Sequence, residues 1–419
     1  MNSVSKANRF LASWIAIVTF FSYSAYFFPK AIKIFFIAPI GLFVISILFY
    51  VSLVFLRRPR IDSFAEVRYI ILLLLVLSFG LLYTNAPNYG FEKILVLYTW
   101  IVLFFVYGNV IVNNFEQFVK VSVLFGIVFV LLLLSRFGDP ISFFRSMQGE
   151  TLRLGYEMDT GMNSGLNPIW AARYLGYIFL LLLIYVREKP RNLFLYGYML
   201  ALILYIVTAG SKGPVIALFG GCFVFFANEK LSVNLKTLFY IVLVLAVLIL
   251  ILNGIDFFSS QFFIDRFSGK STSAEEREGL MEVAFHYFGA FSFLFGTGTG
   301  NFGYMIYHRD VREYPHNIVV ELYIENGIFA IIILALIYIS VLKYYRMIFK
   351  STKLRMLFAM FIYFGLNSMF SGDLLGNEYF FIFFMLFHFE RKMIQKTEQL
   401  ELQLEQFNSG STAYLNTQH

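Results

Sequence analysis

The segment YPHN, from Tyr314 to Asn317, stands at the start of a long apolar run. Pro315 interrupts a helix, and Asn317 has the type of side chain that caps the helix that follows. His316 lies between them. A neutral imidazole titrates near neutral pH and can accept a proton from a hydroxyl group, so His316 is a candidate general base. The alternative is an interfacial histidine that only satisfies a local hydrogen bond.

Arg277 is a candidate for binding an anion. It belongs to the segment STSAEEREGL, in which Ser273 and Glu276 have the spacing of a capping box. The apolar residues that follow have helical spacing, which predicts an amphipathic helix over 274–294. An arginine in the first turn opposes the helix dipole, whereas a helix N-terminus beside an arginine suits a phosphate. The alternative is a surface salt bridge to a neighbouring glutamate.

Three further cations are predicted on the same side of the membrane. Arg173 lies about one turn inside an apolar run, where a charge is costly and marks function by default. It could instead extend to the membrane surface. Lys212, in the turn TAGSKGP, either points at the same site or is an ordinary loop lysine, and Arg266 shares a long loop with Arg277. An anionic ligand on this side would explain why cations gather there.

The pattern of glycines and acidic residues argues against a dinucleotide-binding motif and against a metal site. The run GTGTGNFG has the letters G-x-G-x-x-G at Gly298, Gly300 and Gly303, but no strand or βαβ unit is predicted around it. We expect these glycines to provide a sharp turn or to approach a ligand, and Gly327 to allow a break or close packing in the helix after His316. No D-x-D pair and no metal-ligand spacing occur, so we expect neither a metal nor a cofactor.

Membrane helices must position these residues. The chain has 419 residues, of which 59% are hydrophobic and 14% charged, whereas a soluble domain has roughly a quarter charged. The single Cys222 excludes an intrachain disulfide framework, and the net charge of +7 forms no single patch that would bind nucleic acid. Apolar stretches of about 20 residues predict an all-α integral membrane protein with about twelve transmembrane helices. The predicted spans lie near 10–28, 35–55, 67–83, 94–112, 121–134, 170–186, 193–209, 214–227, 237–252, 318–342, 354–370 and 379–389.

The distribution of Lys and Arg predicts the topology. A cytoplasmic N-terminus places most of them in cytoplasmic loops, as the positive-inside rule requires, and makes the C-terminus cytoplasmic too. The first nine helices then occupy 1–252, a long outward loop 253–317, the last three helices 318–389, and a cytoplasmic tail 390–419. We expect the first apolar run to be a retained helix, not a cleaved signal peptide.

The tail is polar and helix-forming. Met393, Leu400, Leu404 and Phe407 make a rough apolar stripe along it. The stripe is compatible with a solvated terminal helix or with a short helix that binds a partner.

The segment HNIVVELYIENGIFA resembles the signature of the bacterial O-antigen ligase and polymerase family. That signature is His-Asn, nine residues, Gly, two residues and a small residue; here Ala330 stands where Gly, Thr or Tyr is usual. TAGSKG resembles the family's T-x-S-R-G turn, with Lys212 in place of the arginine, which keeps the charge but loses bidentate phosphate binding. NPIWAARYL and EREGLMEVA followed by LFGTGTGNFG also resemble family segments. The resemblance runs in order from about 160 to 380.

The resemblance implies an all-helical glycosyltransferase of the GT-C type in the bacterial cytoplasmic (inner) membrane. Its donor would be an undecaprenyl-diphosphate-linked glycan and its acceptor another glycan or lipid A–core, without metal or nucleotide sugar. By resemblance, His316 activates the acceptor hydroxyl, with Asn317 beside it in the site. Arg277 neutralises the diphosphate, helped by Arg266, Arg173 or Lys212.

Two questions stay open at this point. Polymerases pass the glycan to another lipid-linked glycan and ligases pass it to lipid A–core; we favour a polymerase, because we expect polymerases to be the more numerous. A chain-length regulator or a flippase is a further candidate partner. A multispan transporter of polysaccharide or lipid-linked sugar is the alternative class, but it predicts an internal repeat that the sequence does not show.

Overall fold

The computed structural model describes residues 6, 8–17, 64–138, 168–188, 192–209, 211–227, 282 and 289–416. In these residues the regular structure is helical throughout, as the sequence predicts. The longer helices are α4 (Phe64–Gly80), α5 (Pro87–Asn113), α6 (Phe115–Phe137), α8 (Pro168–Glu188), α9 (Leu193–Thr208), α10 (Lys212–Phe226), α16 (Ile318–Leu342), α17 (Thr352–Phe370) and α18 (Glu378–Asn416). The short ones are α14 (Ala290–Phe295), α15 (Phe302–Tyr307) and the 3₁₀ turns η2 (Tyr345–Lys350) and η3 (Leu374–Gly376).

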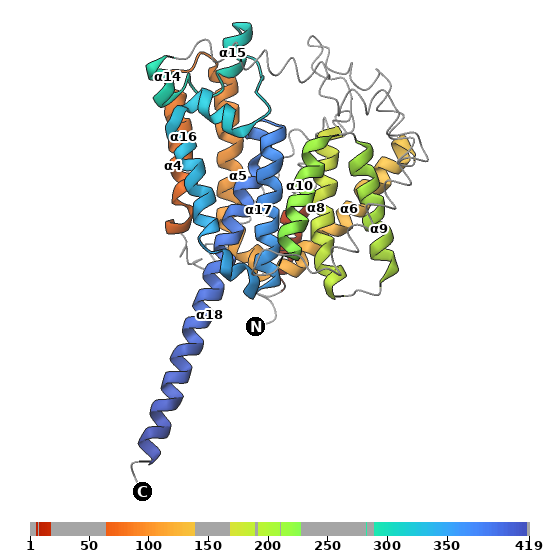
Figure 1. Cartoon of the computed structure of the whole chain (residues 1–419), viewed down its shortest axis with the longest axis vertical. Coiled ribbons are helices and arrows are strands. Elements are labelled where there is room, and N and C mark those ends of the chain that lie inside the picture. Colours follow the sequence, from red (N-terminus) through yellow and green to blue (C-terminus); the bar gives the residue numbers. More distant parts are fainter. Residues whose placement is uncertain are drawn as a thin grey trace.

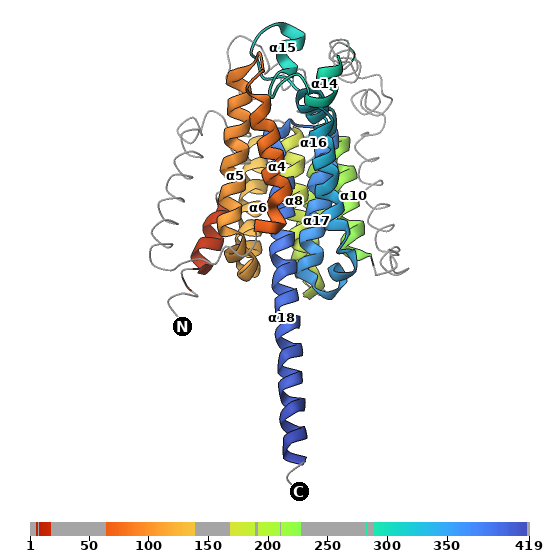
Figure 2. The same ribbon diagram turned by 90° about the vertical axis from the view of Figure 1, so that its left-hand side faces the viewer.

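The long helices stand side by side in a bundle with two different ends (Figures 1 and 2). At one end lie α14, α15 and the segments that connect them, and we call this the loop end. The turn between α4 and α5 also lies there, because the Thr299 amide donates to the Gly80 carbonyl (3.3 Å) and the Asn85 amide to Asn301 Oδ1 (3.2 Å). The second half of α18 leaves the bundle at the opposite end.

Several helices have the length and composition of membrane spans. Within the described residues, three are long and apolar enough to cross a membrane, and the bent pair within α5, with a 49° break, makes a fourth when it is counted as one span. They are Phe115–Ser135, Ile169–Arg187, Ile318–Leu342 and the pair Pro87–Val102 with Tyr107–Asn113. The chain is therefore a helical membrane protein. The predicted spans near 35–55 and 237–252, and most of the one near 10–28, lie outside the described residues.

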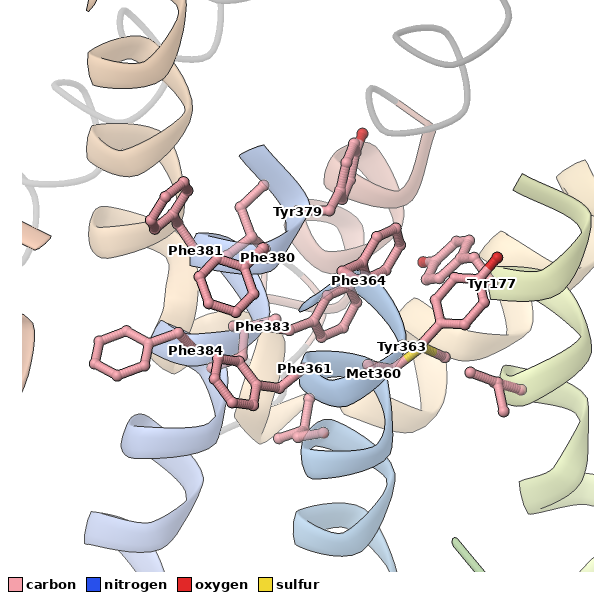
Figure 3. Close-up of a cluster of buried hydrophobic side chains, with 14 of the residues drawn as sticks. Tyr177, Met360, Phe361, Tyr363, Phe364, Tyr379, Phe380, Phe381, Phe383 and Phe384 are labelled. Carbon is pink, nitrogen blue, oxygen red and sulfur yellow. The ribbon is translucent and has the colours of Figure 1, made fainter. Parts of the chain in front are cut away.

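Aromatic side chains hold α17 and α18 together (Figure 3). The rings of Phe364 and Phe383 stack at 5.3 Å with an interplanar angle of 6°, and those of Phe361 and Phe380 at 4.9 Å and 24°. Such pairs add about 0.5–1.5 kcal/mol each beyond the apolar area they bury. Because the two helices are locked side by side, the loop 371–377 between them is held at both ends.

A break in α16 lies at Gly327, as the sequence predicts. Gly327 has φ 70° and ψ −165°, a backbone conformation that residues other than glycine rarely adopt. A Cβ atom at this position would clash with the backbone carbonyl of Leu294, at the end of α14. The break therefore lets α14 pack directly against the backbone of α16.

The glycine run is a sharp turn, as one of its two interpretations predicts. Gly296, Gly298 and Gly300 all have positive φ, at 77°, 109° and 82°. A Cβ atom on Gly298 would lie 2.6 Å from Thr84 Cα, so this segment packs against the turn between α4 and α5. We call 296–303 the glycine return.

The predicted amphipathic helix over 274–294 lies mainly outside the described residues. Its last part differs from the prediction. Gly289 has an extended backbone (ψ −179°), and the separate helix α14 begins at the next residue. An unbroken helix to 294 is therefore wrong, because apolar spacing alone does not locate a glycine break. The tail after 389 is helical, as its composition predicts, since α18 continues without a break to Asn416.

Candidate active site

Asn317 is the N-cap of α16, which confirms the prediction from its position after Pro315. Its Oδ1 accepts hydrogen bonds from the amides of Val319 (2.9 Å) and Val320 (3.3 Å). Its Nδ2 donates to the Met369 carbonyl at 3.0 Å, near the end of α17. One side chain thus both starts α16 and fixes that start to α17.

His316 has an unusual backbone conformation. Its φ is 57°, in the left-handed region that residues other than glycine seldom enter, at a cost on the order of 1 kcal/mol or more. The half-buried imidazole lies against the Tyr314 ring, with the centroids 4.6 Å apart. His308 also has a left-handed backbone (φ 53°, ψ 32°), but it is the C-cap of α15, where this conformation is ordinary. His316 precedes a helix, and strain there is the kind that gathers at functional sites.

Arg173 is buried inside the bundle, with 1% of its surface exposed. Its Nη2 donates to the carbonyls of Asn367 (2.9 Å) and Ser371, and the guanidinium lies 4.9 Å from the Trp170 ring. The alternative of a side chain that extends to the membrane surface is therefore wrong. Arg173 holds the start of the loop 371–377 in place, and its contact with a diphosphate stays a prediction.

Lys212 is the first residue of α10 and is exposed. The next residue, Gly213, touches the end of α17: a Cβ atom there would lie 2.7 Å from the Phe370 side chain. Lys212 therefore lies at the same end of the bundle as the N-terminus of α16.

The described candidates converge on the last turn of α17. Arg173 donates to the carbonyls of Asn367 and Ser371, Asn317 donates to that of Met369, and the neighbour of Lys212 meets Phe370. Sequence spacing could not show this, because the partners come from α8, α10, α16 and α17. Arg266 and Arg277 lie outside the described residues.

A buried ionic triad that the sequence analysis missed lies between α5 and α16. Lys93 Nζ is 2.6 Å from Glu321 Oε1 and 2.8 Å from Glu325 Oε2. The lysine is 0% exposed and each glutamate 1%. The span predicted near 94–112 left Lys93 just outside it, whereas α5 begins at Pro87 and includes this lysine. Buried charges of this kind are tolerated only when paired and hydrogen-bonded.

Each glutamate of the triad also holds a loop. Glu321 Oε2 accepts from the Leu374 amide at 2.8 Å, in the loop 371–377. Glu325 Oε2 accepts from the Gly300 amide at 2.8 Å, in the glycine return. The triad therefore ties both loops to the helix that begins after His316.

Asp373, which is itself buried, forms the centre of a second charged cluster. Arg312 donates two hydrogen bonds to its carboxylate, from Nε to Oδ2 at 3.0 Å and from Nη2 to Oδ1 at 3.2 Å. The Tyr89 hydroxyl donates a third, to Oδ2, at 2.7 Å. Burial by itself favours the protonated carboxyl. The Arg312 charge and the Tyr89 hydrogen bond outweigh that effect and lower the pKa of Asp373 below its usual value.

These clusters revise one argument from the sequence. Lys93 and Arg312 are cations on the predicted outward side, but carboxylates of the protein already neutralise them. The sequence contained a signal for the triad: Glu321 and Glu325 lie four residues apart inside a predicted span, where any charge is costly. Within the described ranges, no three His, Cys, Asp or Glu side chains are grouped as metal ligands.

Comparison with known proteins identifies the central part of the chain. Residues 197–335, about a third of the chain, match the family described as O-antigen ligase. The match confirms the resemblance and includes His316, Asn317, the glycine return and the triad's two glutamates. No curated protein matches the chain.

Proposed function

From this family match, we propose that the protein is a metal-independent membrane glycosyltransferase of the bacterial inner membrane. It transfers a glycan from undecaprenyl diphosphate to a sugar hydroxyl of an acceptor glycan, as an O-antigen-type polymerase. The second candidate is an O-antigen ligase, which passes the same glycan to lipid A–core. The family match supports the ligase or polymerase type in general, and our preference for a polymerase rests on the expectation that polymerases are the more numerous.

The observation that carries the proposal is the conformation of His316. The residue lies half-buried at the loop end, in a strained backbone conformation, directly before the N-cap that anchors α16 to α17. An anchored helix start can hold an imidazole in one place, which general-base catalysis requires. The same position suits an acceptor that approaches from outside the membrane.

The proposed reaction has one proton transfer and one displacement. The neutral imidazole of His316 takes the proton of the acceptor hydroxyl while its oxygen attacks the anomeric carbon of the donor glycan. The bond from that carbon to the diphosphate oxygen breaks, and undecaprenyl diphosphate leaves with the electron pair. We assign its stabilisation to Arg277 and Arg266, with Lys212 at the start of α10.

Arg173 and Asn317 enter this proposal as positioning residues. The Arg173 guanidinium is engaged with backbone carbonyls of α17 and the loop that follows, and Asn317 joins α16 to the same turn. Both would act on the reaction by fixing where His316 stands. A direct contact of Arg173 with diphosphate would require it to release those carbonyls.

The test compares two histidines that both have a positive φ, His316 and His308. Purified protein in nanodiscs is supplied with undecaprenyl-diphosphate-linked glycan, and both glycan transfer and released undecaprenyl diphosphate are measured. His316→Asn keeps a polar residue that tolerates a left-handed backbone but cannot take the proton, so turnover should fall about 10²–10⁴-fold while donor still binds. His308→Asn, the same change at the other positive-φ histidine, is the matched control and should leave turnover unchanged. Near-normal turnover in His316→Asn would remove the general-base assignment.

The acceptor separates the two candidate enzymes. With lipid-linked glycan as the only substrate, a polymerase lengthens the carrier-linked glycan. A ligase gives no longer product until lipid A–core is added. Activity falling as pH drops through the imidazole range, about pH 6.5 in model peptides, is expected for either enzyme.

A further inference from the structure

The second half of α18 is an isolated helix that leaves the bundle. Glu398 still pairs with Lys350 of η2, with Nζ and Oε1 2.7 Å apart. Beyond this pair the helix continues to Asn416, roughly 27 Å at the usual helical rise, and points away from the other helices (Figures 1 and 2). Helices of this length are marginal in water unless an apolar face is packed.

This helix carries an apolar stripe. Leu400, Leu404 and Phe407 are 52%, 61% and 75% exposed. At about 100° per residue, they fall within roughly 60° of one another around the helix axis. Their spacing of four and then three residues is that of the seam in a coiled coil, positions d, a and d of a heptad. Thr397 takes the preceding a position.

Contact with lipid does not explain the exposure of this stripe. Exposed apolar residues such as Leu124 and Leu131 belong to the apolar helix α6, whose composition fits a membrane span. The stripe instead belongs to the segment EQLELQLEQF, which has a charge every few residues and extends beyond the bundle. A protein partner is the surface that would bury it.

The charges beside the stripe fit a second copy of the same chain. In the register set by Leu400 and Leu404, Lys396 is at position g and Glu401 at position e, and both are exposed. In a parallel dimer each g residue faces the e residue five positions later on the other helix, so Lys396 of one copy meets Glu401 of the other, twice. Two copies in one membrane must run parallel, because both helices leave the same face.

We propose that residues 397–407 of α18 form a parallel, in-register coiled coil with a second copy of the chain. The membrane assists this pairing, because confining both copies to two dimensions raises their effective concentration. The proposal is independent of the enzymatic function, since it uses no residue of the loop end.

Disulfide trapping tests the register directly. In the full chain with Cys222→Ser, which removes the only native cysteine, Leu400→Cys should form an intermolecular disulfide in membranes under mild oxidation. Leu402→Cys is the matched control. Leu402 is equally exposed, at 58%, but lies on the opposite side of the helix from the seam. Equal trapping at both positions, or trapping at neither, would overturn the proposal.

A charge exchange separates a second copy from a different partner. In nanodiscs, mass photometry should show several-fold weaker dimerisation for Lys396→Glu, and recovery for the double variant Lys396→Glu/Glu401→Lys. Recovery requires both charges to belong to the same kind of chain, so its absence would contradict self-pairing. Leu404→Gln should weaken dimerisation by roughly 10²-fold, because each dimer loses two buried leucines, while Leu402→Gln should not.

Discussion

Lys93→Met tests whether the buried triad holds the loop end together. The substitution keeps a long unbranched side chain but removes a cation that lies within 2.6–2.8 Å of two carboxylates, each 1% exposed. Removing one partner of a buried ion pair typically costs about 3–5 kcal/mol, because an uncompensated charge stays behind. Two carboxylates share this lysine, so we expect the upper part of that range.

The hydrogen bonds from the two glutamates to loop amides indicate where the structure should loosen. Glu321 and Glu325 hold the amides of Leu374 and Gly300, so repulsion between the two carboxylates should loosen both loops. We expect a lower thermal midpoint in detergent. We also expect faster hydrogen exchange in 371–377 and in the glycine return, while the aromatic contacts between α17 and α18 remain protected.

A compensated variant makes the argument refutable. In Lys93→Met/Glu321→Gln/Glu325→Gln no charge is left, and the amide oxygens can still accept from both loop amides. This variant should lose only about 1–2 kcal/mol, from weaker hydrogen bonds. It should therefore be more stable than Lys93→Met alone. If the triple variant is as unstable as the single one, charge burial is not what the lysine compensates, and the reasoning fails.

Three other predictions follow from the described contacts. Gly327→Ala should destabilise the protein by several kcal/mol in thermal unfolding, because the residue has φ 70° and there is no room for a Cβ atom. The control is Gly197→Ala in α9, which has open space around it and should be neutral or stabilising by up to about 1 kcal/mol. Asn317→Ala should cost about 1 kcal/mol of stability, because α16 loses its N-cap, and should lower transfer activity. Asn317→Asp still caps the helix but cannot donate to the Met369 carbonyl, so it should recover stability more than activity. Equal recovery of stability and activity would argue against a role of Asn317 in positioning His316. The stability supplied by Asp373 should be fully present above about pH 3.9 and be lost as pH falls through its lowered folded-state pKa, so the pH dependence of the thermal midpoint should flatten in Asp373→Asn.

The sequence predicts α16 well because its signals are local. An apolar run with an asparagine before it defines the N-cap, and a single glycine defines the break, so the predicted span 318–342 matches Ile318–Leu342. The glycine return is of the same kind, since positive φ at three positions demands glycine whatever surrounds it. Features that depend on neighbouring residues along the chain could be inferred without a structure.

Features that depend on partners far apart in the chain could not. Arg173 looked like a cation exposed to a ligand, and only the structure shows its carbonyl partners on α17, 194 and more residues away. The predicted spans left a loop at 371–377, but nothing in the sequence marked it as important, and only the structure shows that Asp373 makes it a central element of the loop end. Glu321 and Glu325 were visible as charges in a span, but periodicity could not identify Lys93 as their counterion.

Most of the described cations at the loop end have partners within the protein. Lys93, Arg312 and Arg173 each meet acceptors that belong to the protein, so their presence on the outward side does not require an external anion. Lys212 is exposed, at a helix N-terminus where partial positive charge is already available. The case for a diphosphate therefore depends on Lys212, on Arg277 with its loop, and on the family match. Lys93, Arg312 and Arg173 have a structural role instead, because they fix the two loops and the helix start from which His316 would act.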